Sequence, residues 1–582
     1  MCCRIPNSTR IGNNDGIKYD MIKILSTNIV SPLGYTSEEN YLNVKSGRTG
    51  LRRYENLWGI PETICASLFS QEQNERLMVD GLSRFESLVY YSVNDALSRA
   101  PYDVRGKKVA FILASTKGDI ENLDAKAGVT TIARSAKKVA EKLGINAEPI
   151  AVCNACISGA TAQLLALRLI ESERYDYAIV CGADCQCKFV VSGFSSLKAL
   201  SADYCRPFDI ERYGLNLGEA AATIVYGKAS EDELAEGVWY LHRGAVRNDA
   251  VHICNPSKTA EGAVRAINSV LREGEDVSLV SVHGTATLYN DQMESVALKR
   301  CGLQSVPAMA LKGYFGHAMG AAGILETIIT INAADDCETL PTKGFSELGV
   351  SANVNISDSK ITTKGNSVLK IIAGFGGCNA ALYFSKDASE SCALQSELKL
   401  KSVHSIKITP NDIMVDGEPV DVEPKGMAML TEVYKQQIND YPKYYKMDGL
   451  SRLAFIASEL LLRAEGGEHD NSETRSVILF NNSSSISADL EFEKTIDSSN
   501  YFPSPSVFVY TLPNIAIGEI AIRNTYFGET SFYLLDGKQP KLMDEIVSSS
   551  FLDQQMHSCI SGWINYNDES DFEAELYIKE KE

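Results

Sequence analysis

Two hydrophobic patterns alternate along residues 21–228 of the chain. Short apolar runs such as KVAFILAST (108–116) and YDYAIVCGAD (175–184) predict buried strands. The segments ARSAKKVAEKLG (133–144) and GATAQLLALRLIESERY (159–175) carry apolar residues at the spacing of a helix with about 3.6 residues per turn. This alternation predicts an α/β unit in which helices cover a layered sheet.

The same alternation returns over residues 229–388, so this part of the chain is a second half comparable to the first. Its strands are predicted at VSLVSVHGT, VPAMALKG, VLKIIAGFG and AALYFSKD. Residues 1–20 read as an N-terminal extension, because the first strand-like run, MIKILSTNIV, opens at Met21. Residues 389–402 are polar and read as a linker.

A divergent internal repeat follows the linker, over residues 403–582. The segment 447–464 resembles 79–100, and 476–491 resembles 108–124. In the repeat, TSFYLLDGKQP stands where the first copy has PIAVCNACISG, and it contains no cysteine. The sequence therefore predicts a truncated α/β domain without the chemistry of the first copy.

Composition narrows the class of protein. The 582 residues are 45% hydrophobic and contain no apolar stretch of about 18 residues or more, so we expect no membrane span. The N-terminus lacks the apolar region of about 7–15 residues that a secretory signal requires, which predicts a cytoplasmic protein.

Charge and cysteine content exclude further classes of function. The net charge is -19, of which residues 401–582 carry -15 (15 Lys+Arg against 30 Asp+Glu), and no basic run favours nucleic acid. The 15 cysteines are odd in number and lie mostly in apolar runs, as expected for reduced thiols. Cys181, Cys185 and Cys187 lack a fourth ligand nearby, so we predict no metal site.

Four residues could form a thiol-based active site. Cys156 lies between an apolar strand and a small-residue helix start, where the helix dipole would favour the thiolate. His283 ends an apolar strand, and His317 follows Lys312 in a glycine-rich turn. A buried lysine needs a partner, and Glu326 in the next predicted helix could supply it.

These residues lie in the segments AVCNACISGA, SVHGTATLYNDQMES, LKGYFGHAMGAAG and IIAGFGGCNAA, in that order. Together with IVSPLG, GFSSLKALS and RPFDIERYGLNLGEAAATIV they resemble the elongating β-ketoacyl-acyl-carrier-protein synthases of the thiolase superfamily over residues 21–388. The resemblance implies a thiolase-like layered α/β/α/β/α fold made of two similar halves: 21–228 with the cysteine and 229–388 with the two histidines. The C-terminal domain, 403–582, would then be a truncated thiolase-like α/β domain without catalytic function.

The resemblance also implies roles for individual residues. Cys156 would take an acyl group, His283 and His317 would bind a malonyl carbonyl, and Lys312 with Glu326 would support them. The N–H groups of Cys156 and Phe375 would form an oxyanion hole, with Phe375 also acting as a gate. Thr285 and Thr287 would contact the substrate, which arrives on the phosphopantetheine of an acyl carrier protein; no bound cofactor and no metal is implied. Candidate contacts for that carrier protein are Arg76, Arg84 and Arg206.

Several alternatives stay open on the sequence. A degradative thiolase would need a second active-site cysteine, which Cys378 imitates only superficially, and a non-catalytic partner similar to a chain-length factor would have lost Cys156. CISG recurs at Cys559, which an alternating pattern places in a strand hairpin, and we expect this cysteine to be structural. A homodimer or a heterodimer with another ketosynthase is expected from the family, and the product could be a fatty acid or a polyketide-like or polyene chain.

Four departures from the family pattern are visible. Ala286 stands in HGTAT where a smaller or polar residue is usual, GEAA at 218–221 replaces a glycine-containing form, and Cys378 stands where threonine is common. The region 125–150 is short, which leaves the acyl pocket without a segment that normally shapes it. We therefore expect residues 403–582 to pack against the catalytic domain or a second subunit and to stabilise or shape the acyl tunnel. The alternative is an evolutionary remnant that contributes stability only.

Overall fold

The first half of the chain forms one mixed sheet with the strand order β5-β4-β6-β8-β1. In the computed structural model, which describes residues 21–123, 131–229, 237–388, 398–466, 472–496 and 501–582, β4 runs parallel to β5 and β6, while β8 is antiparallel to β6 and to β1. The strands are β1 (Met21–Val30), β4 (Val109–Ala114), β5 (Ile150–Val152), β6 (Tyr177–Asp184) and β8 (Ala220–Ala229).

Two helices cover the outer face of this sheet. α3 (Arg84–Arg99) packs on β1, β6 and β8, and α4 (Ile132–Leu143) packs on β4 and β5. The Ser83 hydroxyl accepts the Glu86 N–H, and the Glu86 carboxylate accepts the Ser83 N–H. This reciprocal cap fixes the start of α3 after Ser83. α4 ends at Gly144, whose left-handed conformation (φ 70°) favours glycine.

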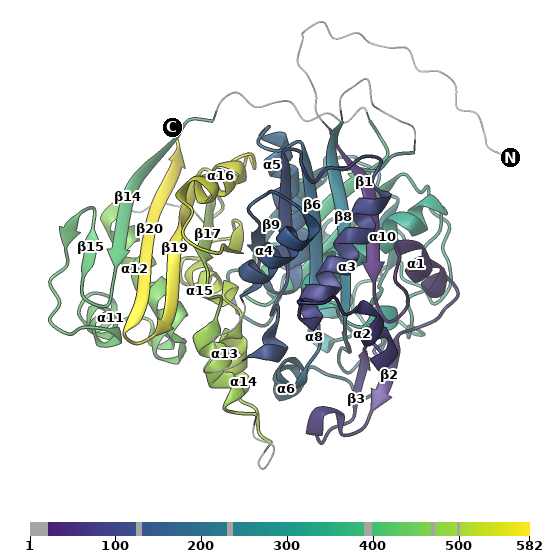
Figure 1. Cartoon of the computed structure of the whole chain (residues 1–582), viewed down its shortest axis with the longest axis horizontal. Coiled ribbons are helices and arrows are strands. Elements are labelled where there is room, and N and C mark those ends of the chain that lie inside the picture. The colour runs from purple at the N-terminus through teal and green to yellow at the C-terminus, as the bar shows by residue number, and fades with distance from the viewer. Residues whose placement is uncertain (1–20, 124–130, 230–236, 389–397, 467–471, 497–500) are drawn as a thin grey trace, which may run out of the picture.

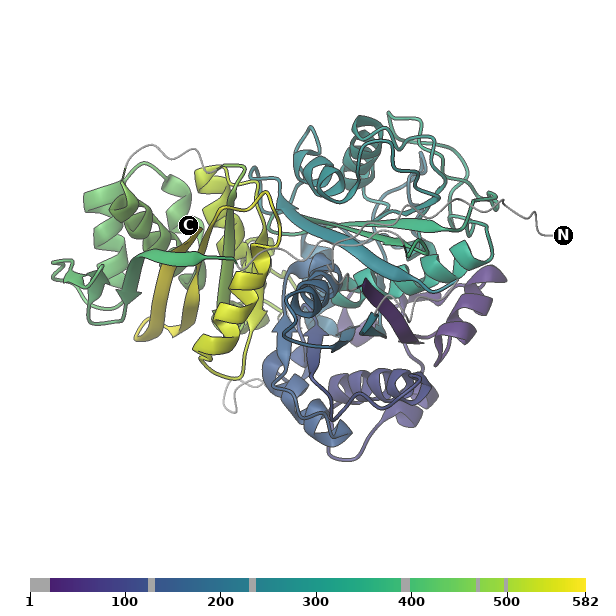
Figure 2. The same cartoon turned by 90° about the horizontal axis from the view of Figure 1, so that it is seen from above.

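The second half repeats this arrangement with the order β9-β13-β12-β10-β11. Its strands are β9 (Tyr240–Asn248), β10 (Leu279–Ser281), β11 (Ala308–Met309), β12 (Ser367–Gly374) and β13 (Cys378–Ser385), and the outer face carries α7 (Glu261–Val270) and α8 (Leu288–Arg300). Between the two sheets lie α5 (Ser158–Glu171) and α10 (Ala322–Asp335), which contact each other and strands of both sheets (Figure 2). The body therefore has the five alternating layers that the sequence predicts.

Smaller elements complete the body at the end that carries β2 and β3 in Figure 1. Strands β2 (Leu51–Tyr54), β3 (Ile64–Ser67) and β7 (Leu217–Gly218) form a separate sheet. The remaining helices are α1 (Ser37–Lys45), α2 (Gln71–Leu77), α6 (Lys188–Ser196) and α9 (Lys312–Phe315), with 3-10 turns η1 (Leu57–Gly59), η2 (Ile120–Asn122), η3 (Ala155–Ile157) and η5 (Met319–Ala321).

The C-terminal domain copies the first sheet with the order β18-β17-β19-β20-β14-β15-β16. Its strands are β14 (Leu400–Ile408), β15 (Ile413–Val415), β16 (Glu418–Pro419), β17 (Arg475–Asn481), β18 (Thr530–Leu534), β19 (Ser558–Asp568) and β20 (Asp571–Lys581). β17 is parallel to β18 and β19, as β4 is to β5 and β6, so the predicted repeat is visible in the strand order.

The helices of this domain lie on both faces of its sheet. α12 (Gly449–Glu465) and α15 (Asn514–Asn524) pack on one face, and α16 (Pro540–Ser550) packs on the other, against α5 of the body. The others are α11 (Met427–Val433), α13 (Ile486–Glu493), α14 (Pro505–Phe508) and the turns η6 (Tyr434–Ile438), η7 (Pro442–Lys446) and η8 (Val509–Thr511). No single helix of the described residues is long and apolar enough to cross a bilayer; one bent pair, 505–511 with 514–524, reaches that length only together.

One strand pair joins the C-terminal domain to the body. β18 pairs antiparallel with β5 through Tyr533↔Val152 and Leu534↔Ala151, and Cys153 N–H donates to the Phe532 carbonyl at 3.1 Å. The two sheets are therefore continuous from β1 through β5 and β18 to β14 (Figure 1). The edge of β5 is therefore occupied by a strand of the same chain.

The segment expected to link body and C-terminal domain is partly a strand. β14 begins at Leu400, inside the predicted linker 389–402, and pairs with β20 at the far edge of the C-terminal sheet. Residues 389–397 and the N-terminal extension 1–20 lie outside the described residues. The first strand begins at Met21, as predicted.

Candidate active site

The nucleophile candidate, Cys156, lies in the turn η3 between β5 and α5. Ala155 has φ 48°, a left-handed conformation that costs a residue other than glycine roughly 1–2 kcal/mol. Hydrogen bonds to the preceding residue hold this turn: Asn154 N–H donates to Ser158 Oγ (2.8 Å), and Asn154 Nδ2 donates to the carbonyl of Thr530 in β18 (2.9 Å). The C-terminal domain therefore braces the nucleophile turn directly.

Burial dominates the acidity of this thiol. It raises the pKa of Cys156 to about 12, although the Lys312 ammonium acts in the opposite direction. The prediction that the helix start favours the thiolate therefore stays a prediction, and burial acts against it.

The two histidine rings predicted for the site lie together. The centroids of His283 and His317 are 5.2 Å apart and their planes make an angle of 80°. Lys312 Nζ, which can only donate, lies 3.1 Å from His283 Nδ1, and Met319 N–H donates to His317 Nδ1 at 3.3 Å. Each Nδ1 is thus an acceptor, and each ring carries its proton on Nε2.

Both rings are held in the neutral form. Burial and then the Lys312 charge lower the pKa of His283 and His317 well below the usual value. His317 Nε2 is buried and has no hydrogen-bond partner among the described residues. A buried donor without a partner costs free energy, so this N–H is placed to bind a ligand atom.

Glu326 binds two lysines rather than the one that the sequence predicts. Lys312 Nζ donates to Glu326 Oε1 at 2.7 Å, as expected, and Lys370 Nζ donates to Glu326 Oε2 at 2.5 Å. Both lysines are buried. The sequence analysis missed Lys370, although a lysine inside the apolar run VLKIIAGFG was a usable signal, since a charge in a buried strand requires a partner.

The loop with Phe375 lies against the cysteine turn. A Cβ atom on Gly374 would lie 3.2 Å from Cys156 N, so a side chain here would crowd the cysteine turn. The Phe375 ring stacks on Phe194 with a centroid distance of 6.2 Å. Asn514 Nδ2, from the C-terminal domain, donates to the Phe375 carbonyl at 2.8 Å and fixes the loop from the other side.

A narrow apolar cavity opens beside Cys156. Two of the side chains that line it, Phe508 and Leu512, come from the C-terminal domain. The others come from the body: Thr116, Lys117, Ala155, Cys156, Val190, Phe194, Met319 and Phe375. The sequence analysis expects contacts from the C-terminal domain but does not identify Phe508 and Leu512. Their proximity to Cys156 arises from the fold, and no local sequence pattern indicates it.

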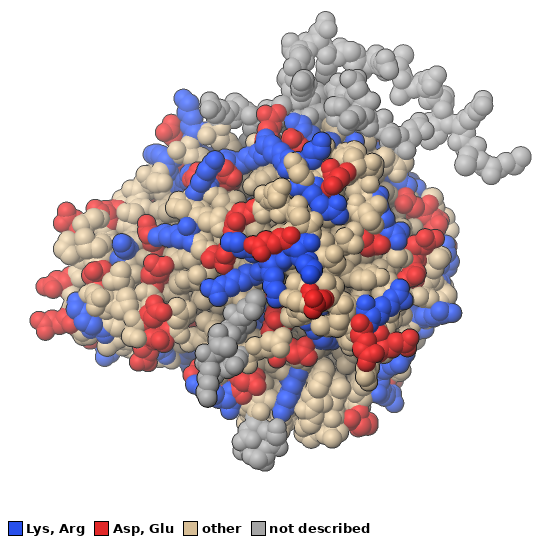
Figure 3. All heavy atoms as spheres, viewed as in Figure 1, with Lys and Arg blue, Asp and Glu red and all other residues tan. Residues whose placement is uncertain are grey.

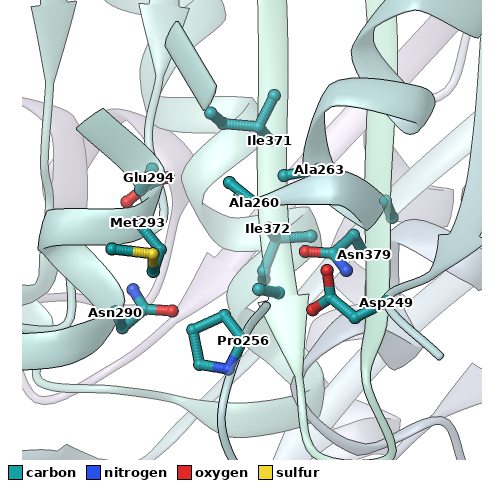
Figure 4. A pocket seen from close by; sticks show the side chains of 12 residues that line it. Asp249, Pro256, Ala260, Ala263, Asn290, Met293, Glu294, Ile371, Ile372 and Asn379 are labelled. Carbon is teal, nitrogen blue, oxygen red and sulfur yellow. The ribbon is translucent and has the colours of Figure 1, made fainter. Parts of the chain in front are cut away.

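The threonines of the HGTAT segment lie next to His283. Thr285 Oγ1 and Thr287 Oγ1 are 2.9 Å apart. Glu294 fixes the start of this segment, because its two carboxylate oxygens accept the N–H groups of His283 (2.5 Å) and Gly284 (2.9 Å). Glu294 also lines a second cavity together with Asn379, Asp249 and other residues (Figure 4).

The remaining sequence candidates are placed as follows. Arg84 is mostly buried and forms ion pairs with Glu219 and Glu121, so its charge is neutralised within the body. Arg76 lies over the Tyr35 ring at 3.9 Å, and Arg206 pairs with Glu211 at 2.6 Å. Cys559 is buried in β19, where it was expected in a hairpin strand.

Sequence comparison assigns the chain to a family. The model of the β-ketoacyl synthase N-terminal domain matches residues 20–231, and that of the C-terminal domain of the same enzymes matches residues 240–346. These matches cover more than half of the chain, including the segments with Cys156, His283 and His317, and end before the segment with Phe375. The chain belongs to the β-ketoacyl synthase family, which confirms the resemblance found in the sequence.

Curated relatives agree with this assignment. The chain is 25% identical over 426 residues to a putative mitochondrial 3-oxoacyl-[acyl-carrier-protein] synthase of Schizosaccharomyces pombe, covering 63% of this chain and 99% of the relative. It is 30% identical over 253 residues to nodulation protein E of Rhizobium leguminosarum bv. trifolii, covering 42% of this chain and 62% of that protein.

Solved structures extend the similarity into the C-terminal domain. The ishigamide ketosynthase/chain length factor aligns with a TM-score of 0.57 and 25% identity, covering 63% of this chain and 99% of that chain. The PfaC ketosynthase-chain length factor aligns with a TM-score of 0.73 over 97% of this chain and 78% of that chain, at 13% identity. The thiolase-like fold is thereby confirmed for the body and, as a fold alone, for the C-terminal domain.

Proposed function

We propose that this chain catalyses the decarboxylative condensation of an acyl group on Cys156 with a malonyl group carried by an acyl carrier protein. The observation that supports it most is the pair of imidazoles whose Nδ1 atoms both accept a hydrogen bond, which leaves the proton on Nε2. Met319, which holds His317, lines the same cavity as Cys156. The family assignment supplies the reaction class.

In the first stage Cys156 accepts the acyl group. Its sulfur adds to the thioester carbonyl, the bond to the pantetheine sulfur breaks, and the thiol proton leaves with that sulfur. The N–H groups of Cys156 and Phe375 would bind the oxyanion. The close approach of Gly374 to Cys156 N supports this geometry, because it brings the two backbones together.

In the second stage a malonyl thioester binds. His283 and His317 donate Nε2–H bonds to its carbonyl oxygen, where negative charge develops as carbon dioxide leaves. The carbanion attacks the acyl carbon, a carbon–carbon bond forms, and the Cys156 sulfur is released. Thr285 and Thr287 would contact the pantetheine arm.

We further propose that the C-terminal domain takes the place of a partner subunit. Phe508 and Leu512 close the cavity beside Cys156, and Asn514 and Thr530 brace the two backbone segments of the oxyanion hole. This arrangement corresponds to a chain-length factor fused in cis and reduced to one sheet. A second copy or another ketosynthase would have to bind elsewhere than at β5, whose edge is occupied.

Carrier protein and location follow from the same proposal. The substrate would arrive on the phosphopantetheine of an acyl carrier protein, and Arg76 and Arg206 remain candidate contacts, while Arg84 is a weaker one because its charge is neutralised. Figure 3 shows Lys and Arg gathered over the middle of one face, where α4 carries Arg134, Lys137, Lys138 and Lys142.

The described cysteines that carry free thiols support a reducing compartment, the cytoplasm.

Mass spectrometry tests the main proposal. Wild-type protein is incubated with acyl-carrier-protein thioesters of several lengths and then with malonyl carrier protein, beside Cys156→Ala and Cys559→Ala as a matched control. We expect an acyl mass on the Cys156 peptide, discharged as a product two carbons longer, in the wild type and in Cys559→Ala only. Absence of the adduct in folded wild-type protein would favour the alternative, a non-catalytic partner similar to a chain-length factor.

The role of the C-terminal domain is tested at the cavity. Phe508→Ala should extend the range of accepted acyl chains, because the ring closes the cavity beside Cys156. Phe551→Ala removes an equally buried ring of the same domain that does not line the cavity. An unchanged chain-length profile in Phe508→Ala would contradict this role.

A further inference from the structure

Lys370 is a buried charge that the two-stage mechanism does not use. It lies on β12, whose register sets it beside Ser281 of β10, two residues before His283. Its side chain is fully buried, and its ammonium contacts Glu326 Oε2 at 2.5 Å and the Val282 carbonyl at 3.4 Å. A buried ammonium is costly, so its retention calls for a physical account.

The three protons of the neighbouring lysine are fully committed. Lys312 Nζ contacts Glu326 Oε1 at 2.7 Å, the His283 carbonyl at 2.6 Å and His283 Nδ1 at 3.1 Å. An ammonium has three donors, so each proton has one acceptor. Only one of these three bonds reaches Glu326, although the carboxylate has a second oxygen within the same site.

We propose that Lys370 is a positioning residue that occupies Glu326 Oε2 and thereby directs Lys312 onto His283 Nδ1. Because Lys370 donates to Glu326 Oε2, Lys312 donates to Glu326 through Oε1 only. One N–H group of Lys312 therefore remains for His283 Nδ1. That donor fixes the His283 tautomer with the proton on Nε2, which is the form that binds the malonyl carbonyl. The inference rests on the proposed function and adds a residue to its second stage.

The charge of Lys370 acts on the histidines as well. The site contains two ammonium groups, Lys312 and Lys370, and one carboxylate between them, Glu326. Glu294 on α8 also faces Lys370, and burial raises the pKa of Glu294 to about 7. Burial lowers the pKa of both His283 and His317 most, and the charges of Lys312 and then Lys370 lower it further, so the neutral rings persist to lower pH.

Removal of the Lys370 charge should therefore shift the pKa values of the two histidines in a defined direction. The pKa values of His283 and His317 rise, the rings protonate at higher pH, and His283 Nδ1 then can no longer accept from Lys312. The acidic limb of the pH profile for malonyl decarboxylation should move to higher pH. The acylation of Cys156 does not use this tautomer and should be much less affected.

The experiment compares the two half-reactions in the full-length chain. Lys370→Met removes donor and charge, and Lys370→Gln keeps an amide donor for Glu326 without the charge. Lys579→Met is the control, because Lys579 is also a buried strand lysine paired with a carboxylate, Asp544, in the C-terminal domain. Release of carbon dioxide from malonyl carrier protein is measured from about pH 5 to 8, and Cys156 acylation is followed by mass.

We expect Lys370→Met to slow decarboxylation about tenfold at pH 7 and to raise the midpoint of the acidic limb by about one pH unit, with acylation within about twofold of wild type. Lys370→Gln should recover part of the rate at pH 7 and keep the shifted limb. Lys579→Met should match the wild-type profile.

A wild-type pH profile in folded Lys370→Met or Lys370→Gln would overturn the inference, as would an equal loss of both half-reactions. If Lys370→Met does not fold, Lys370→Gln decides alone, with thermal unfolding as the check of folding. Failure of the wild type itself to decarboxylate malonyl carrier protein would instead overturn the proposed function.

Discussion

At the scale of single residues, Glu294 couples the active site to pH. Burial raises its pKa to about 7, and both of its oxygens accept backbone N–H groups of the His283 segment. An acid whose pKa is higher in the folded than in the unfolded state contributes stability at low pH that is lost as pH rises towards the folded value. Asp184, with a pKa raised to about 6, acts in the same direction.

Glu294→Gln should remove part of this pH dependence. We expect the decrease of the thermal midpoint between about pH 4 and pH 7 to become shallower. At pH 7 the variant should lose about 1–3 kcal/mol, because an amide NH2 replaces an acceptor of a buried N–H group. Thermal unfolding at a series of pH values measures both, with the exposed Glu38→Gln as control; equal slopes in all three proteins would contradict the argument.

Sequence reasoning found the candidate site residues that the structure brings together and missed their electrostatics. Cys156, His283, His317 and the pair of Lys312 with Glu326 stand in segments with strong local patterns. The effect of burial on the pKa of the Cys156 thiol could not be predicted, because it depends on side chains from distant segments. The lysine in the apolar run VLKIIAGFG signalled that Lys370 needs a partner, but the identity of that partner, Glu326, depends on the fold because it is 44 positions away in the sequence.

At the scale of elements, the packing of α6 on α14 depends on one glycine. A Cβ atom on Gly193 would lie 1.9 Å from the Phe508 ring, which is closer than atoms can approach. Phe508 also lines the cavity beside Cys156. Gly193 therefore sets the position of the ring that closes the cavity.

Gly193→Ala should destabilise the protein by about 1–3 kcal/mol through overpacking, although alanine is a better helix former than glycine by about 1 kcal/mol. Phe508→Ala alone is costly because it removes a buried ring, but in that background Gly193→Ala should cost little further stability, because the clash has disappeared. Thermal unfolding of wild type, both single variants and the double variant measures this coupling. Additive losses would show that the two residues do not interact.

Most elements were predictable from periodicity, while their pairing was not. The strand at 108–116 and the helix at 133–144 were found as β4 and α4. The repeat in 403–582 indicated a second sheet, and its strand order confirms it. The pairing of β18 with β5 joins residues almost 400 positions apart, and the start of β14 within the predicted linker depends on its partner β20.

At the scale of the whole molecule, a buried ion pair links body and C-terminal domain. Arg168 Nη1 on α5 lies 2.7 Å from Glu529 Oε2, just before β18, and both side chains are at most 4% exposed. A buried pair is costly to form, and the loss of one partner leaves an uncompensated charge.

Arg168→Met should therefore cost about 3–5 kcal/mol, whereas Arg168→Met/Glu529→Leu should lie close to the wild type. Chemical denaturation of the four proteins in this cycle measures the difference. If the double variant were as unstable as Arg168→Met, the uncompensated charge would not explain the loss. The pair would then make a net stabilising contribution to the junction.

The strand pair β5–β18 lies within one chain, and this affects the association equilibrium of the two sheets. Two separate subunits that share a sheet edge come apart when they are diluted, but two domains on one chain remain at an effective concentration of roughly millimolar order for a short linker. The complete acyl cavity should persist in every molecule, however scarce the protein is in the cell. On the proposed mechanism Cys156 is the one acyl acceptor of the chain, so the expected stoichiometry of loading is one acyl group per 63.6 kDa.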